Sequence, residues 1–259
     1  MSLIIKHIQD QISKNRNFVG LVVGRVGTGK SYTSMRLAET LDPKFNVDKV
    51  VFKIEDLLEM VHNNTLEKGE VILFDEGGIA ISNRQHYMNK FNKAMAFLLQ
   101  TWRHRNIIMF ITVPDISFVD AGIRKLFDAI IECQEVVKSR RVVRVKWKWI
   151  QVNTQSGKAY FHNPKARNRL KRLEIGKPSV TLINRYEKKK TAFTTELYKK
   201  IQEELKPEEE NKIDVRTCAE CGSKGVFMAA TNTIRCRGCG YQWDVPPKGD
   251  TTPIKLTNV

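Results

Sequence analysis

The sequence predicts an α/β fold: a mainly parallel sheet with helices on both faces, followed by a small metal-binding module. Three observations carry this prediction. A strand-like apolar run, Phe18–Val23, leads through a glycine-rich turn into an amphipathic segment at 32–41. Short apolar runs at 50–52, 71–74 and 107–112 then alternate with helix-like segments, which is typical of a parallel sheet. Two Cys-x-x-Cys pairs stand further along the chain.

The composition indicates a folded, soluble chain. Hydrophobic residues make up 41% of the 259 residues, which is enough for a core. No window approaches the roughly 18 apolar residues that a transmembrane helix needs. The first residues, Met1–Lys6, lack the basic region, apolar stretch and cleavage site of a secretion signal. We expect no membrane span and a cytoplasmic protein, or a protein of a virus or mobile element that acts in the host cytoplasm.

The turn after the first strand reads Gly-Arg-Val-Gly-Thr-Gly-Lys-Ser. With a strand before it and a helix after it, this G-x-x-x-x-G-K-S motif is typical of a phosphate-binding P-loop. Backbone N–H groups surround a phosphate, Lys30 reaches the β- and γ-phosphates, and the Ser31 hydroxyl ligates Mg²⁺. We therefore expect ATP and Mg²⁺ to bind here. The expected nucleotide-binding residues of the loop are Gly24, Gly27, Thr28, Gly29, Lys30, Ser31 and Tyr32.

A second apolar run, 71–74, ends in the acid pair Asp75-Glu76. Downstream of a P-loop, this pattern is typical of a Walker B strand. We expect Asp75 to hold Mg²⁺ together with Ser31. We expect Glu76 to polarise the water that attacks the γ-phosphate.

Residues 88–105 have the pattern of an amphipathic helix that ends in Arg103-His104-Arg105. The strand at 107–112 follows. Its last residue, Thr112, stands at the carboxyl end of a buried strand, the edge where ligands collect in open α/β sheets. Thr112 is therefore either a sensor of the γ-phosphate or a plain residue at the end of a strand.

These motifs resemble those of the HerA–FtsK superfamily of DNA-pumping ATPases, and most closely its zonular-occludens-toxin-like branch. The likeness spans about residues 15–135. The family usually has Gln at the end of the sensor strand, where this chain has Thr112-Val113. The motifs that carry the resemblance are Asp75-Glu76, Arg84, Trp102-Arg103-His104-Arg105, the strand 107–112 and Val119–Arg124.

The resemblance implies a homo-oligomeric ring, expected to be a hexamer, with each ATP at a subunit boundary. It also implies that an Arg from the neighbouring subunit contacts the transferring phosphoryl group, an effect worth about 10³–10⁵ in rate in related systems. Arg103 and Arg105 are the first candidates, and Arg84 ranks below them. The alternative is that these cations cap the carboxyl end of the helix.

A basic segment covers residues 138–190. It holds seventeen Lys and Arg and two Glu, a net charge of +15, while the whole chain carries +16. A positive field this localised favours binding to a polyanion, which is either nucleic acid or an acidic membrane surface. Double-stranded DNA is the expected partner. The alternative is a solvated surface.

Within this segment, residues 143–149 alternate apolar and cationic side chains, and 159–161 provides a return strand. The pattern predicts a β-hairpin with one cationic face. That face either follows a phosphate backbone or discourages edge pairing. We expect 163–190 to be loosely ordered and 192–205 to be helical.

The Cys-x-x-Cys pairs are Cys218 with Cys221 and, after 14 intervening residues, Cys236 with Cys239. In a cytosolic chain this spacing predicts a zinc ribbon with hairpin strands at 226–228 and 233–235. Four thiolates complete the coordination of Zn²⁺, so the site is structural. A module of about 40 residues depends on such a metal to fold.

The expected domains are an ATPase core with an N-terminal helix at 1–135, a basic β-hairpin and helical extension at 136–205, a linker at 206–214, a zinc ribbon at 215–245 and a tail at 246–259. The expected function is an ATP-dependent DNA-translocating or DNA-packaging motor with DNA-stimulated hydrolysis. The alternative is a nucleotide-switched DNA-binding or assembly factor that hydrolyses ATP slowly and does not translocate. The Asp75-Glu76 pair favours the motor, and Thr112 favours the switch.

Overall fold

The computed structural model describes residues 2–63, 65–75, 92–98, 105–164, 173–205, 217–224, 226–230 and 233–244. The chain divides into two compact units, Met1–Ile201 and Gln202–Val259. Each unit has a sheet of its own.

The first unit alternates strands and helices over most of its length. Its elements are α1 (Ser2–Ser13), β1 (Phe18–Val23), α2 (Lys30–Leu41), β2 (Val50–Val51), α3 (Ile54–His62), β3 (Val71–Phe74), β4 (Ile108–Val113), α5 (Ala121–Arg124), β5 (Ala129–Val137), β6 (Val142–Val152), β7 (Ala159–His162), β8 (Leu173–Gly176) and most of α6 (Val180–Leu205). Residues 92–98, inside the helix predicted at 88–105, are also helical.

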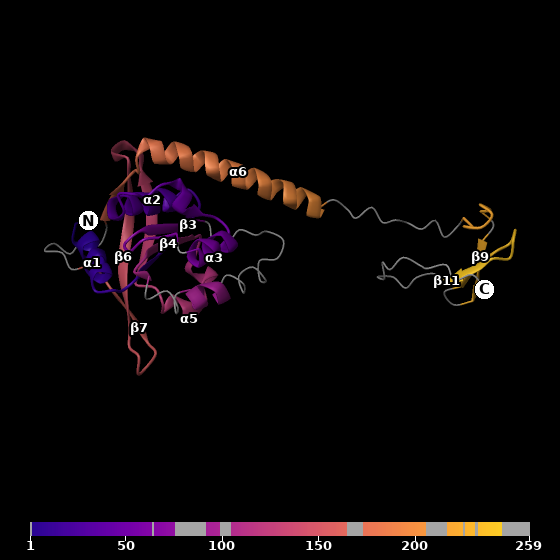
Figure 1. The fold of residues 1–259 in the computed structure, drawn as a ribbon, viewed down its shortest axis with the longest axis horizontal. Helices are drawn as coiled ribbons and strands as arrows, with labels where there is room; N and C mark the ends of the chain where they lie inside the picture. The colour runs from indigo at the N-terminus through magenta and orange to yellow at the C-terminus, as the bar shows by residue number, and fades with distance from the viewer. Residues whose placement is uncertain are drawn as a thin grey trace. The chain divides into compact units, whose positions relative to one another are not determined.

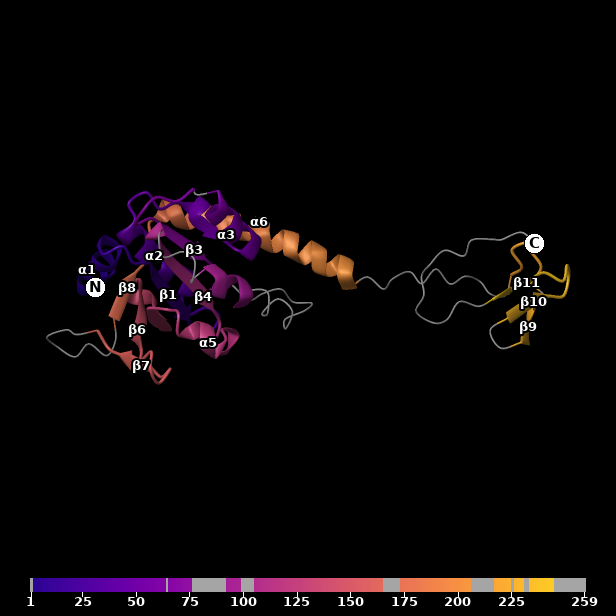
Figure 2. The ribbon, with the colours of Figure 1, turned by 60° about the horizontal axis from the view of Figure 1, so that its bottom comes forward.

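The strands of this unit form one eight-stranded sheet. Its order is β2-β3-β4-β1-β5-β6-β7, with β8 paired to β6. Neighbours from β2 to β5 along this order are parallel, whereas β6, β7 and β8 join antiparallel. Figure 2 shows the antiparallel strands beyond β1. The predicted α/β fold with a mainly parallel sheet is confirmed.

Helices cover both faces of the sheet because successive strand side chains point to opposite sides (Figure 1). Phe18 and Val22 of β1 pack with α1, α2 and α6. Val19 and Leu21 pack with α3, residues 92–98 and α5. Burial on both faces explains why β1 is apolar at every position except Gly20.

Strand register brings the predicted site residues to one edge of this sheet. Val22 of β1 is level with Thr112 of β4, and Phe74 of β3 is level with Ile111. The carboxyl ends of β1, β3 and β4 therefore meet, and the P-loop, Asp75 and Thr112 all start from that edge.

The predicted hairpin at 143–161 is present and continues the main sheet. In β6 the side chains of Val143, Val145 and Trp147 are buried. β7 returns antiparallel to β6, from Ala159 to His162. The boundary expected at 135/136 falls inside β5, whose pairing with β6 joins the extension to the core.

The expectation that residues 163–190 are loosely ordered is wrong for the part that the structure describes. Residues 173–176 form β8, and α6 begins at Val180, well before the helix start expected at 192. Leu182 and Tyr186, one turn apart, are buried, and the Phe193 ring stacks on Phe52 at 4.8 Å between centroids. This apolar stripe stabilises the helix despite its many lysines.

The second unit contains a three-stranded antiparallel sheet in the order β11-β10-β9. Its strands are β9 (Val226–Ala230), β10 (Thr233–Cys236) and β11 (Gln242–Asp244). β9 and β10 are the predicted hairpin, and β11 extends it. The linker expected at 206–214 and the tail expected at 246–259 lie outside the described residues.

Candidate functional site

The P-loop joins β1 to α2 and needs glycine at two positions in particular. Gly24 has φ +154, and a Cβ there would lie 2.6 Å from the Cys133 carbonyl oxygen. Gly29 has φ +86, and a Cβ there would lie 2.7 Å from Val143 Cγ2. Both positions combine a backbone conformation that disfavours side chains with a close neighbour. The loop can therefore turn tightly enough to present its N–H groups in one concavity.

The side chain of Lys30 lies over this loop. Its Nζ donates hydrogen bonds to the carbonyl oxygens of Gly24, at 2.8 Å, and Arg25, at 3.1 Å. Lys30 also lines the cavity beside the loop, which places its ammonium where a phosphate can attract it.

Asp75 is the centre of a buried hydrogen-bond cluster. Its carboxylate is fully buried and accepts hydrogen bonds from the Ser31 hydroxyl, at 2.9 and 3.1 Å. The Thr112 hydroxyl donates to the same carboxylate at 2.7 Å. The alternation of β3 and β4 turns Asp75 and Thr112 towards the α2 face, where Ser31 lies. The Thr112 hydroxyl is thus hydrogen-bonded to Asp75, so Thr112 does more than end the strand.

Two residues of α6, which the sequence reasoning missed, complete this cluster. The Tyr186 hydroxyl donates a short hydrogen bond to Asp75. Lys190 Nζ lies 3.6 Å from the Asp75 carboxylate and donates to the Tyr186 hydroxyl at 3.1 Å. The spacing of Leu182, Tyr186 and Phe193 was the available signal, since it places apolar side chains on one helix face.

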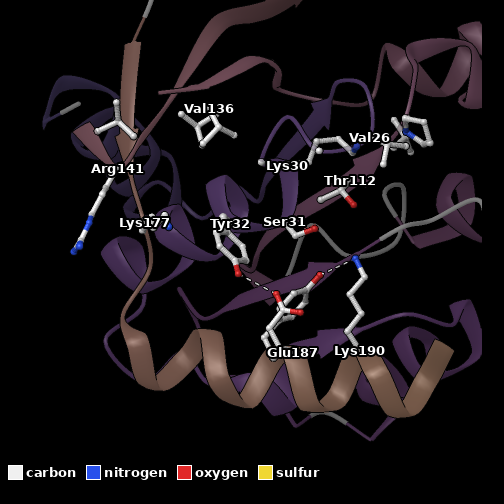
Figure 3. Close-up of a pocket in the computed structure, with 17 residues that line it drawn as sticks. Val26, Lys30, Ser31, Tyr32, Thr112, Val136, Arg141, Lys177, Glu187 and Lys190 are labelled. Carbon is white, nitrogen blue, oxygen red and sulfur yellow. Dashed lines mark hydrogen bonds between the residues drawn. The ribbon is translucent and has the colours of Figure 1, made fainter. Parts of the chain in front are cut away.

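A cavity of about 420 Å³ adjoins the loop and this cluster (Figure 3). The Tyr32 hydroxyl donates to Glu187 at 3.0 Å across it. Burial raises the pKa of Tyr32 above its usual value, and the hydrogen bond to Glu187 raises it further. The lining comes from the P-loop and α2 (Val26, Gly27, Gly29, Lys30, Ser31, Tyr32), β4 and the residue after it (Thr112, Val113, Pro114), the β5–β6 turn (Val136, Arg141, Val142, Val143), Lys177 and α6 (Tyr186, Glu187, Lys190).

These residues fit a nucleoside triphosphate with Mg²⁺. Lys30, Lys177 and Lys190 give the cavity several cations, which suits phosphates. Ser31 and Asp75 offer hydroxyl and carboxylate oxygens, the hard ligands that Mg²⁺ prefers.

Four of the described residues predicted for the nucleotide site do not line this cavity: Gly24, Thr28, Asp75 and Arg105. Glu76, Arg84 and Arg103 lie outside the described residues. Arg105 precedes the amino end of β4, so it stands at the sheet edge opposite the P-loop. It cannot contact the P-loop of its own chain from there, and any role as an Arg finger concerns a neighbouring subunit.

The cationic face of β6 is partly neutralised by its neighbours. Arg144 forms ion pairs with Glu135 of β5 and Glu174 of β8. Lys146 lies 3.5 Å from Glu132. These contacts are exposed and therefore contribute little stability each. They nevertheless reduce the positive field of the hairpin.

In the second unit, the four predicted cysteines form one cluster. Their sulfur atoms all lie within 4.8 Å of one another, with 3.6 Å between Cys218 and Cys239 and between Cys221 and Cys236. A tetrahedral Zn²⁺ with Zn–S bonds of about 2.3 Å places its ligands about 3.8 Å apart. The backbone N–H groups of Cys239 and Gly238 lower the pKa of Cys236, whereas burial and the neighbouring sulfur atoms raise the pKa of Cys239. The cluster can hold a metal ion in a zinc-ribbon fold.

The fifth cysteine has a different environment. Cys133 is buried in β5, and burial raises the pKa of its thiol to about 11. It is a core residue, as a lone thiol beside a buried strand predicts.

None of the helices that the structure describes is both long enough and apolar enough to cross a membrane. This holds for α6, which has 26 residues but carries many lysines.

No protein-family model and no curated protein matches the chain. Among solved structures, it is similar to the N-terminal domain of zonular occludens toxin from Neisseria meningitidis, at 14% identity over 60% of this chain and 97% of that one, with a TM-score of 0.33. It is also similar to the genome packaging NTPase B204 from Sulfolobus turreted icosahedral virus 2 in complex with ATP-gammaS, at 14% identity over 59% and 98%, with a TM-score of 0.34. A third similar structure is EssC (ATPases 2 and 3) from Geobacillus thermodenitrificans, at 11% identity over 61% and 42%, with a TM-score of 0.32.

Overlaps this low carry no argument about activity.

Proposed function

We propose that this chain is an ATPase that moves or packages DNA. The observation that carries the proposal is the convergence of Ser31 and Thr112 on the buried Asp75, beside a cavity with room for a nucleotide that Ser31, Thr112 and the P-loop lysine line. The P-loop, the buried acid and the strand-end hydroxyl come from three separate segments. Because they meet at one edge of the sheet, they support a site that binds a metal ion and phosphates.

Each residue has a role that follows from its chemistry. Lys30 binds the β- and γ-phosphates, and Ser31 and Asp75 hold Mg²⁺. The ion, when bound, neutralises charge that develops on the transferring phosphoryl group. Glu76, which follows Asp75 directly, orients and polarises the attacking water.

The roles of Lys30 and Glu76 are tested by measuring phosphate release from Mg·ATP by the wild type, Lys30→Ala and Glu76→Gln. We expect both variants to lose at least about 100-fold in rate. Glu76→Gln should still bind ATP, because it removes only the base. Lys14→Ala, an exposed lysine remote from the cavity, is the matched control. Equal rates in wild type and Glu76→Gln would contradict the assignment of the base.

The proposed polyanion is double-stranded DNA, because the net charge of +15 is concentrated in residues 138–190. Binding through phosphates releases counterions, so the affinity should fall steeply with salt and depend weakly on sequence. Titration of the protein with duplexes of two unrelated sequences at several salt concentrations measures both properties. A flat salt dependence would contradict a phosphate-driven interaction.

We also propose that the active form is a ring in which a neighbour's Arg103 or Arg105 reaches the ATP. Arg105 lies away from its own P-loop, so within this proposal it acts on the ATP of a neighbouring subunit. Size-exclusion chromatography with light scattering, with and without Mg·ATP, tests the assembly. A persistent monomer would rule out any Arg supplied by a neighbour.

For the second unit we propose that Zn²⁺ occupies the four-cysteine cluster. The sulfur separations and the Cys-x-x-Cys spacing support this metal. The site is structural, since four protein ligands leave no position for a substrate.

A further inference from the structure

Helix α6 passes over the metal side of the nucleotide cavity and is fixed there by several contacts. Tyr186 is among the largest fully buried side chains of the described residues, and Phe193 stacks on Phe52. Lys189 Nζ donates to the carbonyl oxygens of Val47, at 3.0 Å, and Val50, at 2.6 Å. These contacts hold one face of α6 against the site, and residues 186 and 190 are one turn apart on that face.

Lys190 therefore reaches the Asp75 carboxylate, which Ser31 also contacts. Its Nζ lies 3.6 Å from Asp75, while Ser31 and Thr112 approach the same carboxylate. Tyr186 lies between the lysine and the acid and contacts both. Figure 3 shows Lys190 and Glu187 rising from α6 towards the P-loop.

An ammonium beside a fully buried carboxylate compensates its charge, as Mg²⁺ would. Lysine is a point charge on a flexible stem, so its Nζ can turn from a carboxylate to a phosphate by rotation of side-chain bonds. Lys190 lines the cavity together with Lys30, so a phosphate in that cavity lies within its range.

We propose that Lys190 is a second phosphate-contacting lysine of this site, supplied by the chain's own α6 and positioned by Tyr186. The inference rests on the proposed nucleotide site. With no nucleotide, Lys190 compensates the charge of Asp75. With Mg²⁺ and a triphosphate bound, Asp75 would be compensated by the ion, and Lys190 would contact the terminal phosphates.

The test is equilibrium binding of ATP, ADP and AMP, each with Mg²⁺, measured by isothermal titration calorimetry on the full chain. We expect Lys190→Met to weaken ATP binding about tenfold, to weaken ADP less and to leave AMP unchanged, because a charge-assisted contact to the outer phosphates is lost. Lys190→Arg should retain most of the ATP affinity. Lys188→Met, an exposed α6 lysine that does not line the cavity, should bind all three as the wild type does.

Tyr186→Phe tests the positioning role, since it removes the hydroxyl and keeps the ring that packs in the core. We expect a loss of about threefold in ATP affinity and none for AMP. Equal losses for ATP, ADP and AMP in Lys190→Met would indicate a purely structural lysine and overturn the inference. An ATP affinity equal to that of the wild type in a folded Lys190→Met would also overturn it.

The outcome for the wild type separates this inference from the proposed motor. If the wild type binds ATP and shows the expected Lys190 dependence but never hydrolyses it, the motor fails and the inference stands. If the wild type binds none of the three nucleotides, both fail.

Discussion

At the scale of single residues, Asp75 is the side chain on which the nucleotide site depends. It is fully buried, and hydroxyls from three segments donate to it. A buried carboxylate without such donors would be strongly destabilising. The same donors fix the direction in which it presents its oxygens to a metal.

Thr112→Val should therefore weaken Mg·ATP binding by about threefold to tenfold, because Asp75 loses one of its orienting hydrogen bonds. Valine keeps the shape of threonine, so the fold should persist. Thr112→Ser retains the hydroxyl and is the control. Calorimetric titration with Mg·ATP measures the difference, and equal affinities for valine and threonine would show that this hydrogen bond does not matter for the metal.

Gly29→Ala should abolish nucleotide binding, since its Cβ would lie 2.7 Å from Val143 in a strained conformation. Gly27 offers a matched comparison: its φ is +81, but an added Cβ meets nothing within 4 Å. Adding Val143→Ala to Gly29→Ala should restore part of the binding by removing the close contact. If Gly27→Ala were as damaging as Gly29→Ala, the close contact with Val143 would not be the cause.

Asp128 gives a prediction about pH. Burial raises its pKa to about 6, although the Val19 N–H donates to it at 2.7 Å. The unfolded chain releases this proton near pH 4, so the folded state holds more protons between about pH 4 and 6. The contribution of Asp128 to the free energy of unfolding should fall as pH rises through that window.

Asp128→Asn keeps an oxygen for the Val19 N–H and removes the buried charge. We expect it to raise the free energy of unfolding at pH 7 by about 1–2 kcal/mol and to make no such gain at pH 4. Urea unfolding at both pH values measures this. An equal gain in the free energy of unfolding at pH 7 and pH 4 would mean that the charge of Asp128 does not cause the gain.

The residues of the site differ in how far sequence could predict them. Lys30, Ser31 and Asp75 belong to motifs whose function needs fixed types at fixed spacing, so they were found. Tyr186 and Lys190 reach the site only through the packing of a helix that starts far along the chain, and the local apolar spacing predicts a helix face but not which site it covers. Sequence alone also left the role of Thr112 open, because only strand register shows that it is level with the P-loop strand.

At the scale of elements, the lysine-rich composition of residues 188–190 does not predict the helix α6. The run of three lysines at 188–190 resembles a solvated segment, yet Lys189 is half-buried and hydrogen-bonds two backbone carbonyl oxygens. Burial lowers the pKa of Lys189. The parallel strands were easier to predict, because burial on both faces makes them short continuous apolar runs.

The three-stranded module should depend on its metal. Removing Zn²⁺ with a strong chelator should unfold residues 217–244 and leave the first unit folded, since four thiolates replace most of the core of this small module. Elemental analysis should find one zinc per chain in the wild type. Cys218→Ser should lose it, whereas Cys133→Ala, which changes a buried cysteine outside the cluster, should keep it. A metal-free protein with an unchanged NMR spectrum for this module would contradict a structural site.

At the scale of the whole molecule, charge distribution is the feature that connects the proposed ATP site to the proposed DNA partner. The basic segment extends from the β5–β6 turn to α6, and both ends of it line the nucleotide cavity through Arg141 and Lys190. Acidic neighbours neutralise part of β6, and residues 165–172, which hold five of the cations, lie outside the described residues. The expected DNA interaction therefore follows from the sequence and stays a prediction.

The most direct test of the central claim is the rate of ATP hydrolysis with and without double-stranded DNA, at low and moderate salt. We predict that DNA raises the rate of the wild type, that moderate salt reduces the stimulation because phosphate contacts weaken, and that Glu76→Gln shows no stimulation. Hydrolysis that is slow and indifferent to DNA, in a protein that binds ATP tightly, would contradict the motor and favour a nucleotide-controlled switch.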